Sequence, residues 1–108
     1  MRYILFAAAF LPFMAFSAQA EVPEYSIRIK DHKFDPAEVT IPSTTKVKLK
    51  VKNEDATAEE FESHDMNREK VIKGGSEASV FIGPLKPGEY KFFGEFNPKT
   101  AQGKIIVK

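Results

Sequence analysis

The stretch of sequence that decides the fold is Lys46-Val47-Lys48-Leu49-Lys50-Val51-Lys52. Charged and apolar residues alternate here without exception, so the aliphatic side chains share one face and the lysines share the other. A period of two is the period of a β-strand, in which successive side chains point to opposite faces. We therefore predict a strand over residues 46–52. Its lysine face is most simply a solvated face, and a stripe that binds polyanions is the alternative.

Shorter runs of the same kind lie on both sides of this strand. They cover residues 25–30, 39–41, 60–63, 78–82, 90–94 and 104–108. Turn-forming pairs such as Asp35-Pro36 and Gly74-Gly75 separate them. About seven short strands at this spacing predict a Greek-key antiparallel β-sandwich. A helical turn within residues 65–73 is the other element that we expect.

The beginning of the chain has the pattern of an exported protein. Arg2 precedes an apolar run from Tyr3 to Phe16, and Ala18-Gln19-Ala20 supplies the small residues of a cleavage site. This order is typical of a secretory signal peptide, and the run is short for a membrane span. We predict a signal peptide over residues 1–20 that is cleaved after Ala20, a single domain over residues 21–108, and a periplasmic protein that does not span the membrane.

Composition argues against several classes of function. The chain has 16 basic and 15 acidic residues, and Arg2 is the only charged residue of the predicted leader. Residues 21–108 are therefore electrically balanced, which argues against a nucleic-acid-binding protein. The chain has no cysteine, which excludes disulfides, thiolate metal ligands and cysteine nucleophiles. It also has no G-x-S-x-G, H-E-x-x-H or phosphate-loop motif, so we do not expect an enzyme.

Four motifs, in order along the chain, resemble those of small cupredoxins. They are the run Ile29–Ile41, the lysine-rich strand ending in Asn53, the L-x-P-G-x-Y-x-F pattern of Leu85–Phe92, and the closing segment Gly94–Lys108. This resemblance covers essentially all of residues 21–108 and implies a cupredoxin-like sandwich. It also implies that the type 1 copper ligands are missing. Gly94 stands at the cysteine position, residues 58–61 at the first histidine, Asn97 or Pro98 at the second, and Gln102 near the methionine.

A narrower resemblance is to the EfeO-type cupredoxin-like domains of bacterial iron-uptake systems. It rests on the runs Glu59–His64, Asn67–Ile72 and Phe92–Pro98. It implies a periplasmic protein that binds iron or copper through carboxylates and delivers iron to a membrane permease. A ferroxidase-like accessory role is implied in the same way. Glu60 is the best ligand candidate by this resemblance, because a glutamate just before the aromatic residue recurs in those domains.

The residues themselves also suggest a metal site. Glu60, Glu62 and His64 are two positions apart, so in a strand they share the face opposite the core-facing Phe61. Carboxylates with one imidazole suit a hard or borderline cation such as Fe, Mn, Zn or Cu(II). An acidic loop with one histidine and no metal is the alternative. The predicted ligands are Glu60, Glu62, His64, Glu95 from the former ligand loop and, as a weaker candidate, His32.

Three functions stay open at this point. The first is a periplasmic metal-binding protein, holding iron or copper, that works with an iron permease or another iron-uptake component. The second is a metal-free β-sandwich adaptor that docks a membrane transport complex through its loops. The third is a copper chaperone. Met66 is the only methionine after the predicted leader, which counts against the third, because Cu(I) carriers need several soft ligands.

Overall fold

The computed structural model describes residues 21–108, and these residues form nine β-strands and no helix. The predicted signal peptide and its cleavage site after Ala20 lie outside the described residues. The strands are β1 (Glu24–Lys30), β2 (Lys33–Asp35), β3 (Glu38–Ile41), β4 (Val47–Asn53), β5 (Glu59–Ser63), β6 (Arg68–Ile72), β7 (Glu77–Ile82), β8 (Gly88–Gly94) and β9 (Gln102–Val107). With no helix in this part of the chain, none is available there to cross a membrane.

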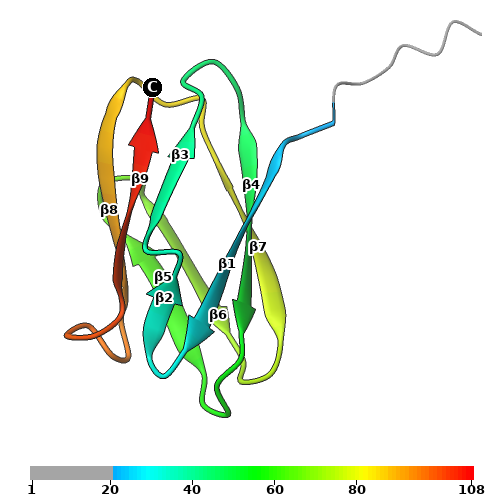
Figure 1. Cartoon of the computed structure of the whole chain (residues 1–108), viewed down its shortest axis with the longest axis vertical. Helices are drawn as coiled ribbons and strands as arrows, with labels where there is room; N and C mark the ends of the chain where they lie inside the picture. Colours follow the sequence, from blue (N-terminus) through cyan, green and yellow to red (C-terminus); the bar gives the residue numbers. More distant parts are fainter. Residues whose placement is uncertain (1–20) are drawn as a thin grey trace, which may run out of the picture.

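The strands build two sheets that face each other as a sandwich (Figure 1). One sheet has four strands in the order β2-β1-β4-β7, and the other has five in the order β3-β9-β8-β5-β6. Most neighbouring strands are antiparallel, as predicted, but β1 runs parallel to β4 and β3 runs parallel to β9. The predicted all-β sandwich is therefore confirmed, with nine strands in place of about seven and with two parallel pairs.

Two short elements account for the strands that the sequence did not reveal. β2 has only three residues, too few for an alternation to be recognised. In β6 only Ile72 is buried, because β6 is an edge strand whose side chains are mostly solvated. The helical turn expected within residues 65–73 is wrong. A turn that ends at Asn67, with φ of 52°, leads directly into β6, which pairs with β5.

Strand β4 has the two faces that its alternation predicts. Val47, Leu49 and Val51 are fully buried between the sheets. On the outer face, Lys48 lies 3.4 Å from a Glu24 carboxylate oxygen and Lys50 lies 3.6 Å from one of Glu77. Because neighbouring acids partly neutralise these lysines, the structure favours a solvated face over a stripe that binds polyanions.

Three phenylalanines join the two sheets at their centre. The ring centroid of Phe92 lies 4.9 Å from those of both Phe34 and Phe61, edge-on to the first and stacked on the second. Phe34 comes from the four-stranded sheet, whereas Phe61 and Phe92 come from the five-stranded sheet. Burying one such side chain stabilises a fold by about 1.5–3 kcal/mol. Phe61 therefore anchors β5, the strand that carries the predicted ligands.

Candidate metal site on the five-stranded sheet

Strand β5 sorts its residues between the core and the surface. Glu59, Phe61 and Ser63 are each no more than 1% exposed, while Glu60 and Glu62 are half-buried on the opposite face. This alternation follows from the strand period, with Phe61 fixing which face is inside. Glu60 and Glu62 consequently lie on the outer surface of the five-stranded sheet, as the sequence predicted.

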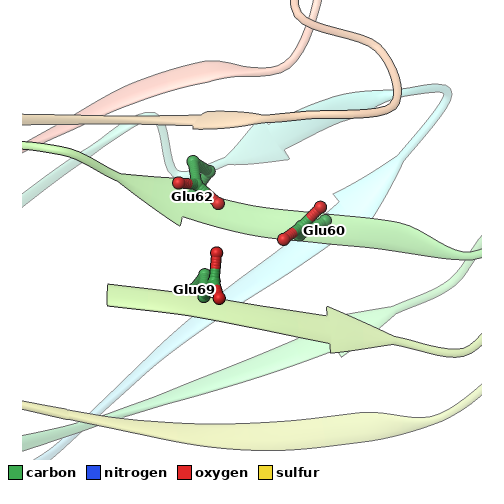
Figure 2. Close-up of side chains that lie close together, drawn as sticks. All are labelled: Glu60, Glu62 and Glu69. Atoms are coloured by element: carbon green, nitrogen blue, oxygen red, sulfur yellow. The ribbon is translucent and has the colours of Figure 1, made fainter. Parts of the chain in front are cut away.

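A third carboxylate joins them from the neighbouring strand. Glu69 of β6 stands directly opposite Glu62, and one oxygen from each of Glu60, Glu62 and Glu69 lies within 4.8 Å of the others. Figure 2 shows Glu69 reaching from β6 toward the two glutamates of β5. We call these three residues the carboxylate cluster. Their oxygens are close enough together for one cation to contact all three after small side-chain movements.

The sequence prediction missed Glu69 for a specific reason. A helical turn within residues 65–73 gives no reason to pair Glu69 with β5. Glu69 is identified as a neighbour of Glu62 by the register of the β5–β6 hairpin, which pairs Glu62 with Glu69 and Ser63 with Arg68. Residues that pair across an antiparallel ladder have their side chains on the same face, about 5 Å apart.

The cluster is an uncompensated concentration of negative charge. Partial burial raises the pKa of Glu60, and the neighbouring carboxylates of Glu62, Glu69 and Glu95 raise it further. Among the ion pairs of residues 21–108, none joins a lysine or arginine to the cluster. Like charges facing each other across a ladder destabilise the sheet, and a bound cation would remove that repulsion.

His64 and Glu95 lie at the margin of the cluster. The Nδ1 of His64 is 3.8 Å from Oε1 of Glu62, and the imidazole lies beside Phe93 with its ring centroid 5.4 Å away. Glu95 directly follows β8, and its backbone N–H donates a hydrogen bond of 2.9 Å to the carbonyl oxygen of Glu60. Both residues are therefore neighbours of the cluster, although neither belongs to its closest trio.

His32 lies in a different environment, in the turn between β1 and β2. Asp31 and His32 both have left-handed φ values, of 53° and 56°, and their backbone N–H groups donate to the Asp55 carboxylate at 2.8 and 3.0 Å. These two hydrogen bonds, that of His32 foremost, lower the pKa of Asp55. The His32 imidazole is 3.6 Å from the same carboxylate. The structure thus associates His32 with Asp55 and not with the cluster.

Three of the positions that the cupredoxin resemblance assigns to the copper site, 59, 94 and 97, do converge, but the Glu59 carboxylate fills the space between them. Gln102, near the methionine position, is exposed. Oε1 of the buried Glu59 accepts hydrogen bonds from the backbone N–H groups of Glu60 at 3.0 Å and Phe96 at 2.9 Å. Its Oε2 accepts one from the side-chain amide of Asn97 at 2.8 Å. A Cβ at Gly94 would lie 2.6 Å from Cδ of Glu59. A side chain at position 94 would therefore force the Glu59 carboxylate or Ala101 to shift.

The site's chemistry follows from its donors. It offers three carboxylates, one neighbouring imidazole and no thiolate, on an accessible face. Such a set suits cations that prefer oxygen ligands and tolerate one nitrogen ligand. It lacks the sulfur ligand that tunes a blue-copper electron-transfer site. The geometry therefore favours cation binding and exchange over electron transfer.

Comparisons with known proteins agree with the sandwich. The family described as Cupredoxin-like domain matches residues 3–107. The uncharacterized protein RP394 of Rickettsia prowazekii (strain Madrid E) is 44% identical over 112 residues, which cover 96% of this chain and 90% of that protein.

Solved structures resemble the chain in fold. Auracyanin A, a "blue" copper protein of Chloroflexus aurantiacus, has a TM-score of 0.70 at 15% identity and covers 82% of this chain and 100% of its own. The metal-binding domain of the Streptococcus pneumoniae Cu(I)-exporting P-type ATPase CopA has a TM-score of 0.70 at 14% identity, covering 85% and 91%. Amicyanin of Paracoccus versutus has a TM-score of 0.63 at 17% identity, covering 85% and 86%. At these identities the likeness is one of fold.

Proposed function

This chain belongs to the family of cupredoxin-like domains, and from that premise we propose that it is a metal-binding protein whose cation sits on the outer face of the five-stranded sheet. The observation that carries the proposal is the convergence of Glu60, Glu62 and Glu69 within 4.8 Å. The interior of the sandwich is an unsuitable alternative, because the Glu59 carboxylate already fills it with both of its oxygens hydrogen-bonded. The proposed site therefore lies on the outer face of β5 at Glu60, next to the interior position of Glu59.

Iron or copper is the cation that we propose. Iron fits the oxygen-rich donor set and the EfeO-type resemblance, and Cu(II) fits the imidazole of His64 beside Glu62. Copper is also the metal named for auracyanin A and for the CopA domain, which share the fold. Competition between the two metals for one site is therefore part of the proposal.

We further propose that the protein acts in the periplasm and hands its cation to a membrane permease for iron. The leader-like residues 1–20 and the EfeO-type resemblance support this location and partner. The outer face of a sheet suits such a transfer, because a partner can reach the cation without opening the sandwich. A ferroxidase-like accessory step would oxidise Fe(II) to Fe(III) at this face and would need an external one-electron acceptor to take up the electron.

A calorimetric titration of the metal-stripped chain with Fe(II), Cu(II) and Zn(II), under anaerobic conditions for iron, tests the binding proposal. Glu69→Gln is the informative variant, since it changes one oxygen to an amide nitrogen in a residue that only the fold brings to the site. Glu77→Gln is the matched control, because it removes the same charge from the outer face of the other sheet.

The expected result is binding by the wild-type chain and the control, weakened at least about tenfold in Glu69→Gln. Equal affinity in all three proteins would show that the metal binds outside the cluster. No binding below millimolar concentration by the wild-type chain would refute the metal function. The metal-free adaptor would then be the function to test, by capture of a permease subunit on the immobilised chain.

A further inference from the structure

Among residues 21–108, no cationic side chain forms an ion pair with the buried carboxylate of Glu59. Its side chain is 1% exposed, and all of its hydrogen-bond donors are neutral, two backbone N–H groups and one side-chain amide. A buried carboxylate is costly unless donors replace its water. Three donors, at 3.0, 2.9 and 2.8 Å, occupy both of its oxygens. This arrangement therefore holds its donors firmly in place.

Two of those donors belong to the loop between β8 and β9. Phe96 and Asn97 lie within residues 95–101, which project as the orange hairpin at the lower left of Figure 1. The loop is closed on itself by the Gly94 N–H, which donates to the Ala101 carbonyl at 2.8 Å, and by the Ala101 N–H, which donates to the Asn97 carbonyl at 2.9 Å. Glu59 thus holds the β8–β9 loop, which is already closed by its own hydrogen bonds, against β5.

The position of Glu95 depends on these hydrogen bonds between the loop and Glu59. Glu95 lies between Gly94, which packs against the Glu59 carboxylate, and Phe96, whose N–H that carboxylate accepts. Its own N–H donates to the Glu60 carbonyl at 2.9 Å. With both flanking residues held, the backbone of Glu95 stays beside Glu60 of the cluster.

We propose that Glu59 is a positioning residue, which orients the β8–β9 loop from inside the sandwich so that Glu95 completes the metal site outside. The metal part of this inference rests on the function proposed above. Adjacent residues of one strand thereby have two roles, Glu60 as a ligand on the outer face and Glu59 as the anchor on the inner face. Glu59 does not contact the cation in this arrangement.

Exchanging the donor and the acceptor between positions 59 and 97 tests whether Glu59 anchors the loop. In Glu59→Gln the new amide N–H₂ meets the Asn97 amide donor against donor, until the Asn97 amide turns over and presents its oxygen, so this is the milder variant. In Asn97→Asp two carboxylates meet, acceptor against acceptor. In the double variant the amide introduced at position 59 donates to the carboxylate introduced at position 97, while the amide oxygen at position 59 still accepts from both backbone N–H groups. The double variant also restores the net charge of the wild-type chain.

Amide hydrogen exchange of the metal-free chain is the first readout, followed by Zn(II) affinity. We expect Phe96 N–H exchange to accelerate roughly tenfold in Asn97→Asp, to accelerate less in Glu59→Gln, and to return to within about twofold of wild type in the double variant. Zn(II) affinity should follow the same pattern. Asn97→Asp separates anchoring from charge, because its added negative charge alone would strengthen cation binding, whereas loss of the anchor weakens it.

Each alternative has its own outcome. Unchanged Phe96 exchange in both single variants would overturn the anchor. Restored exchange without restored Zn(II) affinity in the double variant would show that Glu59 is itself a ligand, against the proposal. Tighter Zn(II) binding in Asn97→Asp would show that charge alone governs the site. A wild-type chain that binds no Zn(II), Fe(II) or Cu(II) would refute the function proposed above, whereas the exchange results would still decide whether Glu59 anchors the loop.

Discussion

Glu62 on β5 and Glu69 on β6 stand directly opposite each other across the antiparallel ladder. Two like charges in register oppose the pairing of the strands that carry them. A chain selected for stability alone would place a lysine at one of these positions, as it does where Lys52 of β4 stands opposite Glu77 of β7. The pair therefore indicates that this face serves a purpose other than stabilising the sheet.

Replacing one member of that pair with the opposite charge should stabilise the metal-free protein. Glu69→Lys turns a cross-strand repulsion into an attraction, so we expect the melting temperature without metal to rise by a few degrees at low salt. The same variant should lose metal binding. Thermal melts with and without Zn(II) measure both effects. A lower melting temperature in the absence of metal would contradict the repulsion.

The pH dependence of stability should reflect the raised pKa of Glu60. Its folded-state pKa lies above the ordinary value, so its contribution to stability is fully present below the ordinary glutamate pKa and is lost as pH rises through the raised value. Metal-free wild type should therefore lose stability relative to Glu60→Gln over that window. Urea unfolding of both proteins from about pH 4 to about pH 7 tests this. A constant difference across the range would argue against it.

Metal binding should show the opposite pH dependence at the same residue. Glu60 must be ionised to bind a cation, so its raised pKa makes affinity fall as pH falls through that value. Isothermal titrations with Zn(II) at several pH values measure this, together with the protons that binding releases. Binding that releases no proton near the raised pKa of Glu60 would show that Glu60 is not a ligand.

The two histidines should differ in their effect on metal affinity. His64 lies 3.8 Å from Glu62, whereas His32 is associated with Asp55 at 3.6 Å. We expect His64→Ala to weaken Cu(II) binding roughly tenfold or more and His32→Ala to leave it unchanged, since losing one imidazole ligand removes a strong Cu(II) donor. Each histidine variant serves as the control for the other in the calorimeter. Equal effects of the two changes would place the copper elsewhere.

Gly94 should not tolerate a side chain. A methyl group there would lie 2.6 Å from Cδ of Glu59 and 2.7 Å from Cβ of Ala101, both in the closed end of the sandwich. Such overpacking typically costs about 1–3 kcal/mol. Urea unfolding of Gly94→Ala measures the cost, with Ser79→Ala on the exposed face of β7 as the control. Wild-type stability in Gly94→Ala would show that the Glu59 carboxylate can move aside.

Most of the sandwich was predictable because its signals are local. Alternation in residues 46–52 fixes a strand and its buried face without reference to any other part of the chain. β6 was missed because Ile72 is its only buried residue, so no alternation marks it. The parallel pairing of β1 with β4 and of β3 with β9 was also missed, since pairing direction depends on how distant segments are connected and not on the residues within a strand.

The sequence by itself determined seven of the nine strands and the two faces of β5, because side-chain direction in a strand has a period of two. The outward position of Glu60 and Glu62 follows from those faces. Only the tertiary structure brought Glu69 to them, separated His32 from them, and turned Glu59 toward Phe96 and Asn97. The last of these relationships joins Glu59 and Asn97, which are 38 positions apart in the chain. No local pattern encodes them, because strand register and loop closure set the distances between segments that are remote in sequence.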